Sequence, residues 1–338
     1  MVLLCACRGR ATTRGHTAPD AAPVPSVAAR FEACARQSAA ERAPAPLRWA
    51  ALELRARDGV LEPTVRQATP SRLLLGVLAD TKEALPATLE NVARLVGRLR
   101  ALGATGVLVL GGLDQRFEGI RAVLEKLHGL PVMGLPGDRE SRSGWQAAVE
   151  GLQPRGVDLT RVRAVILPGA SLIGVPGYHL PHHLFAKEQG CSYSREDLLA
   201  LTPVALRLPG PRLLVAHGPP RGQGSAAVDR AFGEVNIGDP LLRELMRQGD
   251  IRFGVFAHVH EAAGHATTRD GRPVAEGAWS EELLLNVGSA DSVPHDDLQG
   301  RFSRGTAALL EISGSRARYQ MLRAEDTSAA RPRALGSN

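Results

Sequence analysis

Continuous apolar runs that end in a carboxylate or a glycine turn recur along most of the chain. The first three are LLLGVLAD (Leu73–Asp80), GVLVLGG (Gly106–Gly112) and PVMGLPGD (Pro131–Asp138). Uninterrupted apolar runs of this length are typical of strands buried on both faces. Between them, apolar residues recur at steps of three or four over Leu89–Leu99 and Phe117–Leu127, which predicts amphipathic helices. Strands that alternate with such helices indicate βαβ units and a parallel sheet, whose carboxyl edge is where ligands bind.

The second half of the chain keeps the strands but loses the regular alternation. Paired strands are predicted over Arg161–Gly177, followed by a loop at Tyr178–His183, and a helix is predicted over Leu241–Gln248. The remaining predicted strands are Arg212–Pro220, Phe253–His260, Glu282–Asn286, Thr306–Ile312 and Arg316–Leu322. We therefore expect an α/β fold in which two sheets pack face to face with helices outside.

The first seventy residues differ from the rest. From Arg8 to about Pro70 the chain is rich in Ala, Pro and Arg, with short helices expected only at Ala28–Ala40 and Leu47–Arg57. We expect residues 1–70 to be a flexible segment with few core contacts, residues 71–324 to be the folded domain, and residues 325–338 to be a disordered tail.

Composition excludes some classes of protein. With 44% apolar and 22% charged residues, the 338-residue chain is globular, with one large core or two modest ones. The net charge of +6 comes with no cluster of basic residues interleaved with aromatics, so we exclude nucleic acid as a partner. No segment reaches the roughly 18 consecutive apolar residues of a membrane-spanning helix.

The four cysteines form no C-x-x-C pair, and so no zinc ribbon or redox motif is expected. Leu4-Cys5-Ala6-Cys7 resembles the lipobox of bacterial lipoproteins, in which the last cysteine carries the lipid. Too few apolar residues precede Cys7 for a signal peptide. Two interpretations stay open: a cell-envelope lipoprotein whose only membrane contact is this anchor, or a cytoplasmic protein with an ordinary apolar terminus.

Two histidines one residue apart, His258 and His260, follow the apolar run FGVFA. Residues i and i+2 of an extended strand point to the same side, so the two imidazoles can meet at one point beyond the strand. A solvated histidine pair gives the same pattern. Their position after a buried strand nevertheless makes them candidate metal ligands.

Five strand ends carry polar segments in a fixed order: ADTKE with Asp80, PGDRE with Asp138, VAHGPP with His217, AHVH with His258 and His260, and Asn286-Val287-Gly288-Ser289. This order resembles the calcineurin-like metallophosphoesterases, over roughly Arg72–Leu322. In that family D-x-H, G-D-x-x-D, G-N-H-[DE], a lone His and G-H-x-H follow one another, often before N-x-G-S. The resemblance implies a four-layer sandwich of two mixed sheets with flanking helices. It also implies hydrolysis of phosphate esters, with Asp80, Asp138, His217, His258 and His260 as metal ligands.

Departures from the pattern affect the metal centre directly. The histidine of D-x-H is Lys82, the aspartate that bridges the two metals is Gly112, and the last aspartate of that motif is Gln115. The histidine of G-N-H-[DE] is Arg139. A dinuclear centre holds its ions about 3.5–4 Å apart, usually through the shared carboxylate. We therefore expect no dinuclear centre, and at most one divalent Mn, Zn or Fe ion.

Two arrangements of the remaining residues stay open. Asp138, His217 and His258 can form a mononuclear site, in which Asp138 restores the anion missing at Gly112. Alternatively no metal binds: Lys82 pairs with Asp80 as a fixed cation, and the histidines bond to the backbone. Asp138 and Arg139 are the candidate catalytic residues. A guanidinium can hold a phosphate with two hydrogen bonds but cannot serve as an acid near neutral pH.

Three further features are weaker candidates. The histidines of the loop at residues 178–183 can shape a pocket or hold a metal, although a solvated loop fits as well: His179, His182 and His183. Asp114 is either a surrogate metal ligand or a helix cap. Gly218–Ser225 lacks the Lys-Ser/Thr of a phosphate loop and indicates a mobile rim.

The function predicted from these features has two alternatives. One is an impaired phosphate-ester hydrolase acting on a small phosphate-containing molecule. The other is an inactive relative that binds an anion or serves as a scaffold. Function resides in the site rather than in the fold, so the fold cannot choose between them.

Overall fold

The computed structural model describes residues 34, 47–57, 59–65, 72–162, 164–298, 300 and 302–325. Its six-stranded sheet has the order β19-β18-β4-β5-β6-β7. Four of these strands are parallel, and β18 pairs antiparallel with both β4 and β19. The strands are β4 (Leu73–Leu78), β5 (Gly106–Val109), β6 (Val132–Gly134), β7 (Gly156–Asp158), β18 (Thr306–Ser313) and β19 (Arg316–Arg323). The crossover helices are α2 (Pro86–Ala101), α3 (Phe117–Lys126) and α4 (Arg142–Glu150).

The second sheet has nine strands in the order β1-β2-β3-β8-β9-β10-β13-β15-β14. They are β1 (Leu47–Trp49), β2 (Leu52–Arg57), β3 (Val60–Pro63), β8 (Ala164–Leu167), β9 (Ala170–Val175), β10 (Arg212–Ala216), β13 (Phe253–Phe256), β14 (Ala266–Thr267) and β15 (Leu283–Asn286). Helices α5 (Arg195–Arg207) and α6 (Pro240–Gln248) belong to this half. Two short hairpins stand apart from both sheets: β11 (Arg230–Ala231) with β12 (Val235–Asn236), and β16 (His295–Asp296) with β17 (Phe302–Ser303). Single 3₁₀ turns are η2 (Pro181–His183), η3 (Lys187–Gln189), η4 (Phe232–Glu234) and η5 (His260–Ala262).

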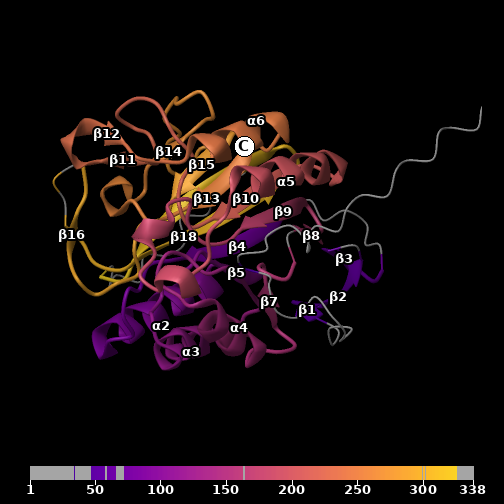
Figure 1. Ribbon diagram of the computed structural model, residues 1–338, viewed down its shortest axis with the longest axis horizontal. Helices are drawn as coiled ribbons and strands as arrows, with labels where there is room; N and C mark the ends of the chain where they lie inside the picture. The colour runs from indigo at the N-terminus through magenta and orange to yellow at the C-terminus, as the bar shows by residue number, and fades with distance from the viewer. Residues whose placement is uncertain are drawn as a thin grey trace, which may run out of the picture.

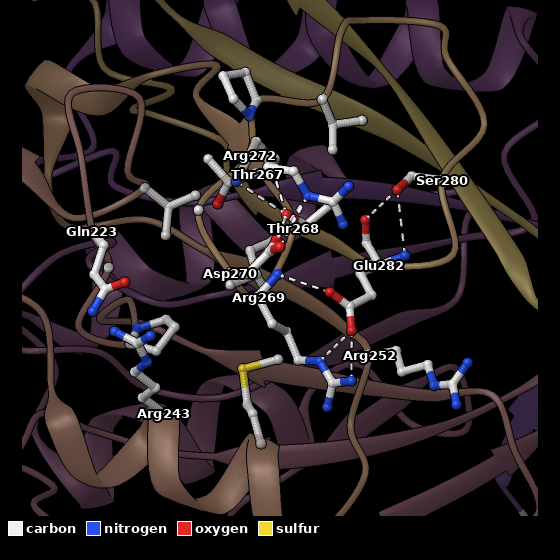
Figure 2. Close-up of a pocket in the computed structure, with 18 of the residues that line it drawn as sticks. Gln223, Arg243, Arg252, Thr267, Thr268, Arg269, Asp270, Arg272, Ser280 and Glu282 are labelled. Atoms are coloured by element: carbon white, nitrogen blue, oxygen red, sulfur yellow. Dashed lines mark hydrogen bonds and ion pairs between the residues drawn. The ribbon is translucent and has the colours of Figure 1, made fainter.

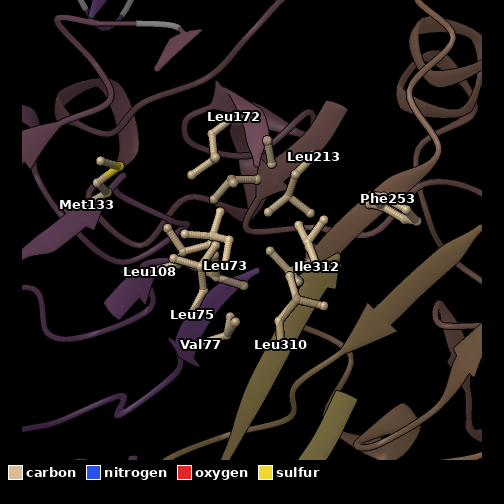
Figure 3. Packing of buried hydrophobic residues seen from close by; sticks show 14 of the residues in the cluster. Leu73, Leu75, Val77, Leu108, Met133, Leu172, Leu213, Phe253, Leu310 and Ile312 are labelled. Carbon is tan, nitrogen blue, oxygen red and sulfur yellow. The ribbon is translucent and has the colours of Figure 1, made fainter. Parts of the chain in front are cut away.

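The layers follow from the alternation of side chains along each strand. In β4, Leu73, Leu75 and Val77 face the other sheet and pack in one cluster with residues such as Leu172 and Leu213 (Figure 3). The opposite faces of the two sheets are covered by α2, α3 and α4 on one side and by α5 and α6 on the other (Figure 1). Both faces of the central strands are therefore buried, which explains their uninterrupted apolar runs. The predicted arrangement of two mixed sheets between helices is confirmed.

The segment Leu47–Pro63 departs from the sequence-based expectation. It forms β1, β2 and β3 rather than a tether or a short helix, and β3 pairs with β8 at the edge of the large sheet. Trp49 is 2% exposed and packs against Gly106, where a Cβ would collide with its ring. These strands are only three to six residues long. They pair with one another in chain order, but β3 joins the sheet through β8, which lies far along the chain, so local composition did not reveal them.

A disulfide joins Cys34 to Cys191 across 157 positions, which no local cysteine spacing could have predicted. The lipobox-like Leu4–Cys7, the rest of Ala28–Ala40 and the tail beyond residue 325 lie outside the described residues. Within the described part of the chain, no helix has the length and apolarity needed to cross a membrane.

Candidate metal centre

Residues from five separate strand ends meet at the carboxyl edge of the two sheets. Asp80 follows β4, Gly112 follows β5, Asp138 follows β6, His217 follows β10 and His258 follows β13. Parallel strands bring their carboxyl ends to one edge, and here both sheets contribute to the same point. Contacts of 3.1–3.9 Å join the side chains of Asp80, Asp138, His217 and His258, and a Cβ added at Gly112 would meet Asp80 Oδ1.

Asp138, His217 and His258 form the only group of three potential metal ligands found among the described residues. Asp138 Oδ1 lies 3.1 Å from His217 Nε2, and His258 Nδ1 lies 3.2 Å from His217 Nε2 and 3.5 Å from Asp138 Oδ2. Ligands about 2.0–2.1 Å from a tetrahedral ion are separated from one another by about 3.3 Å. The two distances to Asp138 involve its two different oxygens, and with one atom taken from each residue the three donor atoms lie within 4.8 Å of one another. Small side-chain shifts therefore suffice for all three residues to bind one metal ion.

His217 is completely buried, and its second ring nitrogen fixes its orientation. Nδ1 lies 2.9 Å from the carbonyl oxygen of Leu110, to which it can only donate a hydrogen bond. Nε2 therefore faces Asp138 and is the coordinating atom, an arrangement common in histidine ligands. Burial disfavours the charged ring, but the carboxylates of Asp80 and Asp138 raise the pKa of His217 to about 9. Without a metal the His217 ring is an imidazolium between the carboxylates of Asp80 and Asp138. These two carboxylates therefore already stabilise a positive charge at the place where a metal ion would bind.

His258 has the opposite electrostatic character. Burial, together with the charge of His217, lowers the pKa of His258 to about 4, so this ring is neutral and one of its nitrogens is unprotonated. Its backbone has a positive φ of 66°, and its N–H donates to Asp80 Oδ2 over 2.8 Å. The ring of Tyr178 packs on it at 4.3 Å between centroids. Left-handed backbone is disfavoured for such a residue, so the surrounding contacts hold His258 in place.

Asp80 and His260 lie beside the three-residue group rather than in it. Asp80 Oδ1 is 3.9 Å from His217 Nε2, and Asp80 Oδ2 is 3.5 Å from His260 Nε2. Despite burial, the neighbouring histidines lower the pKa of Asp80 well below its usual range, so it is a carboxylate. His260 Nε2 is buried and makes no hydrogen bond of good geometry. Of the five predicted metal ligands, three form the compact group and two flank it.

Gly112 is closely surrounded where the family pattern has the bridging aspartate. Its φ is +73°, and a Cβ there would collide with Asp80 Oδ1 and lie 3.0 Å from His217 Cε1. The carboxylate of Glu140 accepts hydrogen bonds from the N–H groups of Gly112, Leu113 and Gly137, which closes the loop from below. The space of the missing side chain is therefore filled by Asp80.

The N-x-G-S segment supports the site without contacting the ligand atoms. Asn286 Nδ2 donates to the carbonyl oxygens of Val259 and Val228, and Asn286 Oδ1 accepts from the N–H of Gly288. Ser289 Oγ donates to the carbonyl oxygen of Asp80 over 2.6 Å. This segment thus ties together the loops that carry Asp80 and His258.

A cationic edge adjoins the group. Lys82 Nζ lies 3.1 Å from His295 Nε2, and the structure shows no direct Lys82–Asp80 ion pair, so that predicted pairing is wrong. Arg139 donates from Nη1 to the carbonyl oxygen of Lys82 over 3.1 Å. His295 was not predicted, because it lies in a hairpin with no strand-end pattern. Its ring lies beside that of His260, tilted by 35° and at 4.8 Å between centroids.

The weaker candidates are placed as follows. Asp114 accepts from the backbone N–H groups of Ala84 and Arg116, so it neither points to the site nor caps α3, whose N-cap is Arg116. His179 and His183 cluster around Tyr178, with His182 against His183, and no metal-binding trio forms there among the described residues.

A cavity of about 1420 Å³ lies elsewhere on the large sheet, beside α6 and β14 (Figure 2). Its charged residues are largely paired with one another: Arg269 with Glu282, and Arg272 with Asp270. None of the five predicted metal ligands lines it. The chemistry of the candidate centre therefore does not depend on this cavity.

Comparison with solved structures identifies the fold. The chain is similar to TT1561 of Thermus thermophilus, with 12% identity and a TM-score of 0.51 over 75% of this chain and 99% of that one. It is also similar to the purple acid phosphatase PPD1 from yellow lupin seeds, with 11% identity and a TM-score of 0.53 over 79% of this chain and 54% of that one. A third is GAP50, the anchor in the inner membrane complex of Plasmodium, with 11% identity and a TM-score of 0.50 over 77% and 87% of the two chains.

No protein-family model matches the sequence, and no curated protein matches it. The structural likenesses establish that the chain has the metallophosphoesterase fold, a four-layer sandwich with its ligand edge at the strand ends. At 11–13% identity they establish nothing further.

Proposed function

We propose that this protein binds one divalent metal ion through Asp138, His217 and His258 and hydrolyses phosphate esters slowly. The observation that carries the proposal is the approach of three potential ligand atoms, one from each of three different strand ends, to within 4.8 Å of one another. Two imidazoles and one carboxylate suit Zn²⁺, Mn²⁺ or Fe²⁺. The choice of phosphate esters rests on the metallophosphoesterase fold, which is an analogy.

The chain's own residues set the expected rate. A divalent ion held by these three ligands supplies Lewis-acid chemistry. Arg139, at the rim of the site, presents a guanidinium that holds and orients a phosphoryl group, but it cannot protonate a leaving oxygen. Gly112 supplies no carboxylate for a second ion. Since each lost transition-state interaction costs about 2.7–4 kcal/mol, we expect turnover at least a hundredfold below that of a dinuclear enzyme.

The test is hydrolysis of p-nitrophenyl phosphate and its diester with Mn²⁺ present. We expect slow, Mn²⁺-dependent turnover in the wild type, its loss in His258→Ala, and no change in His128→Ala. His128 is exposed at the end of α3 and serves as the matched control. Turnover that survives in His258→Ala would place the activity elsewhere. Turnover as fast as that of a dinuclear phosphoesterase would refute the impaired site.

A second candidate is an anion-binding or scaffold protein without turnover. Gly112 provides no carboxylate for a second metal ion, and the Arg139 guanidinium can bind an anion but cannot protonate a leaving oxygen. Both features favour anion binding without hydrolysis. The neighbour GAP50 is named as an anchor and carries the same fold. Phosphate binding at the site with no detectable hydrolysis at any Mn²⁺ concentration would select this candidate.

A further inference from the structure

The carboxylate that bridges the two metal ions of the dinuclear pattern is missing at Gly112, yet two side-chain cations stand beside the first site. We propose that Lys82 and Arg139 form an anion clamp that replaces the charge of that second ion, and that the ligand of the site is a phosphate monoester dianion. The proposal deepens the proposed function, because it names the substrate class and the residues that select it.

Lys82 is held in position by its backbone. Its φ is +58°, in the left-handed region that lysine disfavours. Its N–H donates to the carbonyl oxygen of Gly112 over 2.8 Å, and its own carbonyl oxygen accepts from Arg139 over 3.1 Å. These two hydrogen bonds therefore hold the loop in an unfavourable backbone conformation. In this conformation the Lys82 side chain extends from the backbone at the edge of the Asp138–His217–His258 group.

The side chain of Lys82 is directed by the β16–β17 hairpin. Lys82 Nζ lies 3.1 Å from His295 Nε2, and His295 Nε2 lies 3.6 Å from Asp291 Oδ2. His295 is thus a positioning residue: its ring limits where the ammonium group can lie. Burial lowers the pKa of Lys82, and the neighbouring charge of Arg139 lowers it further, whereas Asp291 and Asp80 oppose this.

Arg139 is the second cation. Its guanidinium lies over the ring of Phe185 at 4.2 Å from the centroid, and Nη1 is bound to the carbonyl oxygen of Lys82. In the part of the chain that the structure describes, no carboxylate pairs with it. The aromatic contact fixes the plane of the group and leaves further N–H donors free for a ligand.

The two cations lie on different loops, after β4 and after β6, which the Arg139–Lys82 hydrogen bond joins, and their charges repel each other. One divalent ion would balance Asp80 and Asp138, which leaves Lys82 and Arg139 to face Asp291. A bound anion relieves this repulsion, and a dianion does so better than a monoanion. A phosphate monoester carries a charge of about −1.5 to −2 near neutral pH, whereas a diester carries a single negative charge. The clamp thus favours the monoester.

The experiment measures binding of inorganic phosphate to the full chain by calorimetry, both with Mn²⁺ and after chelation. We expect Lys82→Gln and Arg139→Gln each to weaken phosphate binding at least about tenfold under both conditions, because each removes a charge-assisted hydrogen bond. Mn²⁺ affinity should be unchanged or slightly higher in both variants. Lys187→Gln is the matched control, because Lys187 is an exposed lysine that also has a positive φ, 48°.

Two further arms address folding and selectivity. Lys82→Arg keeps the charge and should retain most of the binding, and His295→Gln keeps an acceptor for Lys82 and should bind better than His295→Ala. The wild-type preference for p-nitrophenyl phosphate over bis(p-nitrophenyl) phosphate, in binding or turnover, should fall at least about fivefold in Lys82→Gln.

Wild-type phosphate affinity in Lys82→Gln and Arg139→Gln would overturn the clamp even if one Mn²⁺ still binds. Absence of Mn²⁺ binding in the wild type would refute the proposed function alone, because the clamp is measured after chelation as well.

Discussion

Replacing Gly112 with Asp would restore the side chain that the metallophosphoesterase pattern has at this position. From the pattern alone, Gly112→Asp with Lys82→His and Arg139→His should rebuild a dinuclear centre. The structure points to the opposite result, because Asp80 Oδ1 occupies the place of the new Cβ and His217 Cε1 lies 3.0 Å from it. The loop has closed around the glycine.

Two terms set the size of the effect. A non-glycine residue at a φ of +73° costs about 1–2 kcal/mol, and forcing extra atoms into a packed site costs about 1–3 kcal/mol. Together they predict a loss of about 2–5 kcal/mol, a large part of the 5–15 kcal/mol by which proteins are typically stable. Gly112→Ala carries the same backbone and Cβ terms. The additional loss in Gly112→Asp measures the repulsion from Asp80, which is ionised.

The assay is the thermal unfolding midpoint in chelator, followed by Mn²⁺ titration of the folded variants. We expect the midpoints to fall in the order wild type, Gly112→Ala, Gly112→Asp, and the triple variant to bind no second ion. A Gly112→Asp protein that is as stable as the wild type, or a triple variant with two tightly bound ions, would refute the claim that Asp80 fills this space.

Three further outcomes are expected. A metal ion must displace the proton of His217, whose pKa is raised to about 9, so Mn²⁺ affinity should rise about tenfold per pH unit between about pH 6 and 8. In the metal-free protein, the stability that the charged ring contributes is lost as pH rises toward 9. An Mn²⁺ affinity that does not change with pH would show that His217 is not a ligand. Deleting residues 1–71 removes β1–β3 and buried Trp49 and should lower the unfolding midpoint by several degrees, whereas an unchanged midpoint would return this segment to the role of a tether. Asn286→Ala should cost about 1–3 kcal/mol in urea unfolding and weaken Mn²⁺ binding, and an effect on neither would mean that its hydrogen bonds do not support the site.

The strands and the position of the site could be predicted from sequence because they depend on local patterns. Buried parallel strands give uninterrupted apolar runs, and the polar residue after each run marks the carboxyl edge, as for Asp80, His217 and His258. Helix α5 was missed although Ser194 and Asp197 form a capping box at its start, because Pro203 interrupts its pattern.

Other features could not be found in this way because they depend on contacts between distant residues. β1–β3 become strands only by extending a sheet edge whose partner, β8, lies about a hundred residues further on. The link between Lys82 and His295 spans 213 positions. Asp80 fills the space beside Gly112 only because the loops that carry these two residues pack together in the folded protein. A comparison of sequence motifs shows only that the aspartate is absent at position 112.

The most direct test of the account is the number of metal ions that the full chain binds, measured by equilibrium dialysis against Mn²⁺ with elemental analysis. We predict one ion per chain in the wild type and in His128→Ala, and none held tightly in His258→Ala. Two ions per chain, or one ion that His258→Ala still holds with wild-type affinity, would contradict a single centre formed by Asp138, His217 and His258.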